Sequence, residues 1–190
     1  PPGRRDGEAR ALLEERGVRC LAPACEEAAT EHGGIARALA STGAVSACIL
    51  ARVCCGGAFA ATLRAAFPAA RFLFLPHDLH FLREEREAVL QGDAEALEAA
   101  QRTREQERRL IDSCDATLLV SQYEMNVAAT LSPGARCVHL PLTRSDIVFA
   151  TPEGRRDIGF IGNFGHRPNG DAVRHFLAAV WPSIAARSPG

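Results

Sequence analysis

Short apolar runs alternate with longer amphipathic segments along this chain of 190 residues. Brief runs rich in Val, Ile, Leu and Phe are typical of buried strands, and apolar residues that recur every three or four positions are typical of helices. The runs predict strands at residues 18–22, 45–51, 71–75, 116–120, 137–140 and 157–161. The amphipathic segments predict helices near residues 6–16, 26–41, 58–67, 81–90, 94–113, 122–131 and 171–186.

This alternation predicts an α/β fold, with a Rossmann-like parallel sheet covered by helices on both faces. The segment 141–155 carries turn residues such as Pro141, Pro152 and Gly154, so we expect a linker there. The expected domains are then residues 1–140 and residues 156–190, the second opening with a fresh strand, loop and helix.

Charge excludes one class of partner. The chain has 22 basic residues, all of them Arg, against 23 acidic ones, for a formal net charge of −1. Such a balance provides no general attraction for a polyanion, so we expect no nucleic-acid partner. No apolar run reaches the length of about 18 residues that a membrane span needs, and no signal peptide is visible. We therefore expect a cytoplasmic protein.

The seven cysteines lie mostly within apolar runs, which predicts reduced, buried thiols rather than a disulfide framework. Cys20 and Cys25 have four residues between them, but no second Cys or His pair follows at zinc-like spacing. We expect no metal site.

A glycine-rich loop follows the predicted strand 157–161. Gly162 and Gly165 permit a positive φ, and Asn169 is a good N-cap for the helix that comes next. Free amides and the helix dipole favour an anion at such a corner. The residues predicted to bind a phosphate or nucleotide donor are Gly162, Asn163, Phe164, Gly165, His166, Arg167 and Asn169.

Polar side chains also follow the predicted strand 71–75 directly. His77, Asp78 and His80 should lie at the carboxyl edge of the sheet, where open α/β folds keep their sites, and Arg83 should lie one turn into the next helix. A plainer interpretation makes Asp78 the N-cap of that helix and places Arg83 in surface ion pairs.

Two other polar segments have simple structural interpretations. Ser121 and Glu124 have the spacing of a capping box at the start of the helix 122–131, although both are also candidates for the wall of a cleft. The densely charged segment 93–114 has charges at spacings of three and four, as expected for a solvated helix face that serves as scaffold.

Three of these segments together resemble the family 4 (group 1) retaining glycosyltransferases. Residues 156–173, followed by Phe176, Trp181 and Pro182, resemble the opening of that family's C-terminal domain. Residues 75–87 and 114–124 resemble its acceptor-side domain. The resemblance implies a GT-B fold of two Rossmann-like domains, with the nucleotide-sugar in the cleft between them.

The same resemblance implies roles. Asp78 and His80 would be the catalytic pair, with His77, Arg83, Ser121 and Glu124 as further cleft residues. The partners would be a nucleotide-sugar donor and a carbohydrate or lipid-linked acceptor, used in surface polysaccharide or glycolipid synthesis. The family's chemistry calls for no cofactor or metal, and its acceptors allow peripheral association with the inner face of the membrane.

Departures from the family pattern leave alternatives open. The glycine-rich loop near the start of the first domain, the carboxylate motif that grips the donor and the later basic side chains for the diphosphate are all missing. The chain starts without Met and stops as a helix ends, so we expect a fragment that is inactive alone. The main alternative is a non-catalytic flavodoxin-like binding or regulatory module, which predicts all six strands in one sheet. A dinucleotide oxidoreductase lacks its fingerprint.

Overall fold

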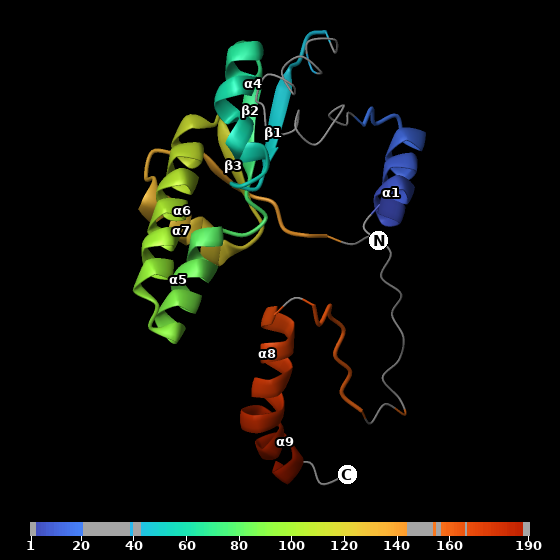
Figure 1. Cartoon of the computed structure of the whole chain (residues 1–190), viewed down its shortest axis with the longest axis vertical. Helices are drawn as coiled ribbons and strands as arrows, with labels where there is room; N and C mark the ends of the chain where they lie inside the picture. The colour runs from blue at the N-terminus through green and yellow to red at the C-terminus, as the bar shows by residue number, and fades with distance from the viewer. Residues whose placement is uncertain are drawn as a thin grey trace. The chain divides into compact units, whose positions relative to one another are not determined.

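The chain forms two compact units, Pro1–Thr143 and Arg144–Gly190. The computed structural model describes residues 3–20, 39, 43–143, 154, 157–165 and 167–187, shown in colour in Figure 1. The first unit contains a sheet with its helices, and the second contains a long interrupted helix. Each unit is described separately below.

The sheet of the first unit has four parallel strands in the order β1-β2-β3-β4. They are β1 (Ala47–Ala51), β2 (Arg71–Leu75), β3 (Ala116–Leu119) and β4 (Cys137–His139). The register pairs Leu50 with Phe74 and Phe74 with Thr117. The described residues therefore confirm an α/β fold built on a parallel sheet.

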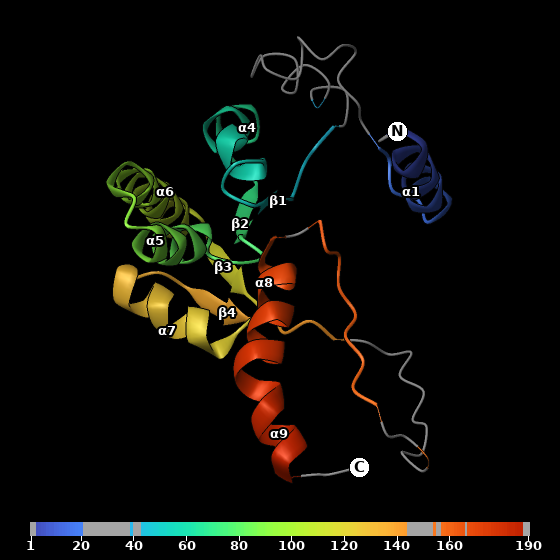
Figure 2. The same ribbon diagram turned by 60° about the horizontal axis from the view of Figure 1, so that its bottom comes forward.

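The helices between the strands cover one face of this sheet. They are α4 (Ala60–Ala66), α5 (His80–Gln91), α6 (Ala94–Ser113) and α7 (Gln122–Leu131), and Figure 2 shows them on the same side of the strands. Right-handed crossovers between strands in consecutive order all return over the same face. The expectation of helices on both faces is therefore not met within the described residues; most of the predicted helix 26–41 lies outside them.

The core lies between the sheet and these helices. Phe72, Phe74 and Leu119 are fully buried on the helix-facing side of the strands, and Leu110 and Ile111 pack on them from α6. On the opposite side Ile49 stays 60% exposed. Alternate residues of a strand face opposite sides, so this contrast follows the pleat.

Clear stop and start signals join α5 to α6. Gly92 ends α5 in the left-handed region with φ 65°, and Asp93 caps α6 by accepting a hydrogen bond from Ala96 N at 3.0 Å. Glycine adopts that conformation without strain, and Asp is a favoured N-cap. The predicted bounds of β2, α6 and α7 are confirmed, and those of β1, β3, β4 and α5 differ by one or two residues.

The chain before the sheet departs from prediction at one element. The helix α1 (Gly3–Glu15) agrees with the helix predicted at 6–16, but residues 18–20 of the predicted strand 18–22 form no strand. Instead, Arg16, Gly17 and Val18 fold back onto the end of α1 through backbone hydrogen bonds to Leu13 and Glu14. The rest of that predicted strand, residues 21 and 22, lies outside the described residues.

The second unit is built on one continuous helical stretch. It consists of α8 (Arg167–His175), the π-helical turn η2 (Phe176–Val180) and α9 (Trp181–Arg187). The prediction of a strand at residues 157–161 is wrong, because these residues form no strand and pair with none of the four described strands. A strand needs a neighbour to pair its backbone, and the described part of this unit offers none.

None of the helices in the described residues is both long enough and apolar enough to cross a bilayer.

Candidate functional site

The carboxyl ends of all four strands meet at one edge of the sheet, because the strands are parallel. Backbone hydrogen bonds continue past the strand ends, from Arg52 N to Leu75 O at 2.9 Å and from Leu140 N to Leu119 O at 2.8 Å. The chain after β1 is thereby tied to the end of β2, and the chain after β4 to the end of β3. This edge is where the predicted residues of the first unit come together.

The loop after β2 begins with an unusual backbone conformation. His77 has φ 68°, one of two positive values among the described non-glycine residues; the other is Arg52, after β1. Positive φ costs an L-residue about 1 kcal/mol or more and persists where surrounding contacts enforce it. The turn at His77 redirects the chain so that Asp78 and His80 follow at the edge of the sheet.

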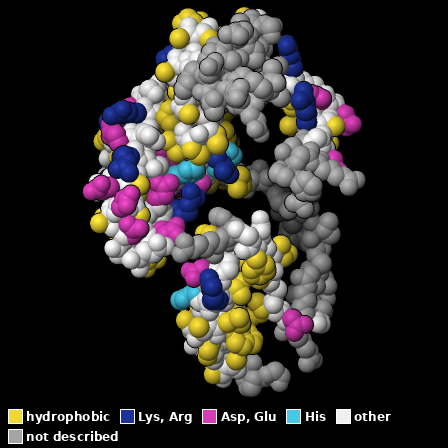
Figure 3. All heavy atoms as spheres, in the orientation of Figure 1, with side chains coloured by type: hydrophobic (Ala, Val, Ile, Leu, Met, Phe, Trp, Pro, Cys, Tyr) yellow, Lys and Arg dark blue, Asp and Glu magenta, His cyan; other side chains and the backbone are white. Residues whose placement is uncertain are grey.

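Asp78, His80 and Arg83 form one cluster. Arg83 Nη1 donates to Asp78 Oδ2 at 2.5 Å, and His80 Nε2 lies 3.5 Å from Asp78 Oδ1. His80 is only 7% exposed, whereas the Asp78 and Arg83 side chains are each 44% exposed. Figure 3 shows histidine, arginine and acidic side chains gathered on one face of this unit. The carboxylate therefore bridges a buried imidazole and a guanidinium at the surface.

Two buried carboxylates from other helices hold the start of α5. Glu124 Oε1 accepts from Leu79 N at 2.9 Å, and Glu107 accepts from His80 N at 3.0 Å and from Phe81 N at 3.2 Å. The interpretation of Asp78 as the N-cap is wrong, since the cap position is Leu79 and makes no side-chain hydrogen bond. The free amides of the first turn are satisfied instead by long-range acceptors.

Glu107 has an environment that disfavours its charge. Its side chain is fully buried, and burial raises its pKa from 4.5 to about 7, against the opposing effect of the His80 and Phe81 amides. The charges of Glu84 and Asp78 raise it further. Desolvation is thus the dominant cause. The Glu107 carboxyl, which accepts from the His80 backbone amide, therefore gains or loses its proton near neutral pH.

The sequence prediction missed Glu107 by assigning the whole segment 93–114 to a solvated face. Most of that helix is indeed exposed; for example, Arg108 pairs with Glu105 at 2.8 Å and with Asp112 at 2.5 Å. Glu107, however, lies seven residues after buried Ala100 and four before buried Ile111, on the apolar stripe. A charged residue on the buried face of an amphipathic helix is the signal that would have found it.

The N-cap half of the predicted capping box at α7 is confirmed, whereas the Glu124 carboxylate accepts from the Ser121 hydroxyl rather than from the Ser121 amide that a full box uses. Ser121 Oγ accepts from Glu124 N at 3.2 Å and lies 2.9 Å from Glu124 Oε2. Because the other Glu124 oxygen accepts from Leu79 N, this box also ties the β3–α7 loop to the loop after β2.

Replacing Ser121 by Ala is expected to lower the free energy of unfolding by about 1 kcal/mol, the usual value of an N-cap side chain. Urea unfolding followed by circular dichroism measures it. Ser46 precedes β1 without capping a helix, so Ser46→Ala is the matched control and should stay close to the unaltered chain. Equal losses in both variants would contradict the role of the cap.

The predicted donor loop lies in the second unit and is held by hydrogen bonds from its own side chains. Gly165 N donates to Asn163 Oδ1 at 2.9 Å, and Asn169 Nδ2 donates to Asn163 O at 3.0 Å. Asn169 is not the N-cap, since α8 already begins at Arg167. Gly162 does not take a positive φ; a Cβ there would instead meet the Phe160 ring at 2.8 Å.

Three further residues were predicted to bind the donor: Phe164, His166 and Arg167. Phe164 packs on Phe160 with ring centroids 5.6 Å apart and is 65% exposed. His166 lies outside the described residues, as does the side chain of Arg167. Role assignments in this loop stay predictions.

Cysteine placement differs from prediction at two positions. Cys54 and Cys55 are exposed, whereas Cys20, Cys48, Cys114 and Cys137 are partly buried; Cys25 lies outside the described residues. Within the described ranges no three His, Cys, Asp or Glu side chains gather as a metal site. The exposed pair lies in the turn after β1. The apolar run before this turn led to the prediction that both thiols are buried.

No protein-family model, curated protein or solved structure matches this chain.

Proposed function

We propose that this chain is part of a nucleotide-sugar-dependent glycosyltransferase that transfers a sugar to a hydroxyl acceptor. The cluster of Asp78, His80 and Arg83 at the carboxyl edge of a parallel sheet carries the proposal. Ligands of open α/β sheets bind at this edge. The resemblance of residues 75–87 and 156–173 to family 4 glycosyltransferases supplies the reaction class.

In this proposal the half-exposed Asp78 carboxylate accepts a hydrogen bond from a hydroxyl group of the acceptor or of the transferred sugar. His80, 3.5 Å from Asp78 and held from below through its backbone amide, fixes the direction of that carboxylate. Arg83 is engaged by Asp78, so its charge serves first to orient the carboxylate and only secondarily to attract a phosphate.

The donor loop of the second unit is proposed to contact the diphosphate, with catalysis resting on stabilisation of the leaving group. The acceptor is a carbohydrate or lipid-linked sugar, and the reaction takes place on the cytoplasmic side. The flavodoxin-like alternative requires residues 157–161 to join a single sheet. Those residues form no strand, and the described sheet has four strands, so no observation favours that alternative.

The test is carried out on the full-length protein of which this chain is proposed to be a part. It measures release of nucleoside diphosphate from a panel of nucleotide-sugars with carbohydrate acceptors, together with calorimetric titration of the same donors. Asp78→Asn and His80→Gln are each expected to lower kcat/KM about tenfold or more, in keeping with the loss of about 1.5–3 kcal/mol for a hydrogen bond to a charged group. Asp112→Asn, an exposed acid paired with Arg108 on α6, is the matched control.

Unchanged turnover in the Asp78→Asn, His80→Gln double variant would remove the pair from the mechanism. Failure of every donor both to bind and to turn over would contradict the transferase itself.

A further inference from the structure

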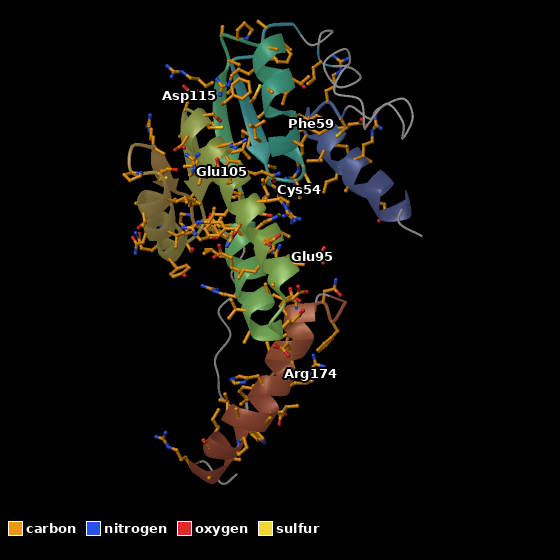
Figure 4. All side chains as sticks on the ribbon, turned by 60° about the vertical axis from the view of Figure 1, so that its left-hand side comes forward. Cys54, Phe59, Glu95, Glu105, Asp115 and Arg174 are labelled. Atoms are coloured by element: carbon orange, nitrogen blue, oxygen red, sulfur yellow. The ribbon has the colours of Figure 1, made fainter. Side chains whose placement is uncertain are left out.

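Cys54 and Cys55 place two thiols together at the end of β1. Both residues are exposed, and their Sγ atoms lie 3.7 Å apart. Figure 4 shows Cys54 on the side of α6 and well away from Asp115, which precedes β3 at the opposite end of the sheet. Adjacent cysteines do not have to face each other, so this proximity is a property of the turn.

The turn that presents the thiols is tightly built. Gly57 N donates to Arg52 O at 2.9 Å, and Ala58 N donates to Cys55 O at 3.2 Å, where the 3₁₀ turn η1 (Gly56–Phe59) begins. A Cβ on Gly56 would come within 2.5 Å of Ala51 N, and one on Gly57 within 2.6 Å of Leu110 Cδ1. At Gly56 the neighbouring Ala51 backbone leaves no room for a side chain, so glycine is needed there for the turn to pack this closely.

The separation of the sulfurs suits one shared metal ion. With metal–sulfur bonds of about 2.3 Å, two sulfurs 3.7 Å apart enclose an angle of about 107° at the metal, close to the tetrahedral angle. Thiolates are soft ligands that select zinc and similar thiophilic ions. The pair needs little rearrangement to act as a chelate.

A disulfide is the less suitable product for this pair. The described residues contain no cis peptide, so the two Cα atoms are about 3.8 Å apart, below the range of about 4.4–6.8 Å that disulfides span. A disulfide would therefore strain the turn.

We propose that Cys54 and Cys55 form a bidentate site for one thiophilic divalent cation of the Zn²⁺ or Cd²⁺ type. Two thiolates balance the charge of such an ion. Within the part of the chain that the structure describes, no third Cys, His, Asp or Glu lies with the pair. Water or a small exogenous ligand would complete the coordination of the ion. The site is open, exchanges its metal readily and is independent of the sugar-transfer proposal.

Binding should strengthen with pH, because metal ligation displaces the thiol protons. The hydrogen bond with the Cys55 thiol is the main cause that raises the pKa of Cys54, and nearby Arg52 opposes it.

The test is titration of the whole chain, reduced with a phosphine, with Cd²⁺, followed by the ultraviolet sulfur-to-metal charge-transfer absorbance. One Cd²⁺ per chain is expected, and Cys54→Ser or Cys55→Ser should each weaken binding about tenfold or more, as losses around metal ligands do. Both positions are exposed, so the fold tolerates serine. Cys48→Ser and Cys114→Ser, single partly buried thiols, are the matched controls and should keep the affinity.

Three results would overturn the proposal: no charge-transfer band in the unaltered chain, an unchanged affinity in either Cys54→Ser or Cys55→Ser, or loss of the band in the Cys48 or Cys114 control. A circular dichroism spectrum of each variant separates loss of the ligand from loss of the fold.

Discussion

Replacing Glu107 by Gln is expected to remove a pH-dependent loss of stability of about 3 kcal/mol. Burial raises the pKa of the Glu107 carboxyl from its ordinary 4.5 to about 7 in the folded chain. Each pKa unit corresponds to about 1.4 kcal/mol, which gives the expected size. Gln keeps the shape of the side chain and one acceptor, but it cannot ionise.

The sign follows from proton binding. Between about pH 4.5 and pH 7 the folded chain keeps the Glu107 proton that the unfolded chain has lost, so the free energy of unfolding falls as pH rises. The contribution is fully present below about pH 4.5 and is lost as pH passes about 7. Gln has one acceptor for the two amides of His80 and Phe81, so the variant starts less stable in acid. Its deficit should then shrink, by about 3 kcal/mol, towards about pH 8.

Urea unfolding at a series of pH values measures this difference. Glu98→Gln is the matched control, because Glu98 is an exposed acid on the same helix α6. Its difference from the unaltered chain should stay nearly constant with pH. If the stability deficit of Glu107→Gln also stayed constant with pH, the Glu107 carboxyl would have the same pKa in the folded and unfolded chains. That result would contradict its burial in the folded chain.

Replacing Phe74 by Ala is expected to cost about 3–5 kcal/mol of unfolding free energy, the range for truncation of a buried aromatic ring. Phe74 is fully buried in the middle of the sheet, paired in register with Leu50 on one side and Thr117 on the other. Strands on both sides restrict collapse of the cavity. The lost contacts therefore add to the lost transfer free energy.

Leu90→Ala on α5 serves as the control, since Leu90 is 86% exposed and its truncation should change stability by about 0.5 kcal/mol or less. Chemical unfolding of both variants gives the comparison. A loss below about 1 kcal/mol for Phe74→Ala would place this ring outside the packed core.

Local signals made much of the first unit predictable. The apolar run of β2 and the helical periods of α6 and α7 lie between recognisable turn and cap residues, such as Asp93 and Ser121. Their bounds could be predicted because capping depends on neighbours in sequence. The strand expected at 157–161 failed for the opposite reason, because a strand depends on a partner that the sequence pattern does not specify.

The candidate site was predictable only in its outline. Parallel-sheet topology predicted a site at the carboxyl end of β2, and Asp78 and His80 follow that end directly in the sequence. Glu107 holds the His80 backbone amide by a hydrogen bond between residues 27 positions apart in the sequence. The local charge pattern instead predicted that Glu107 is exposed to solvent. The exposed thiols of Cys54 and Cys55 escaped notice because apolar neighbours in sequence do not determine burial at a turn.

The two-residue junction at Gly92 and Asp93 has a consequence for how the sheet assembles. Parallel strands β2 and β3 are separated by about 40 residues, and closing a flexible loop of that length costs about 3 kcal/mol of chain entropy. Once α5 and α6 pack as a local hairpin, most of that connection is already ordered. Pairing of the two strands then becomes nearly a short-range event, which favours fast assembly of this part of the sheet.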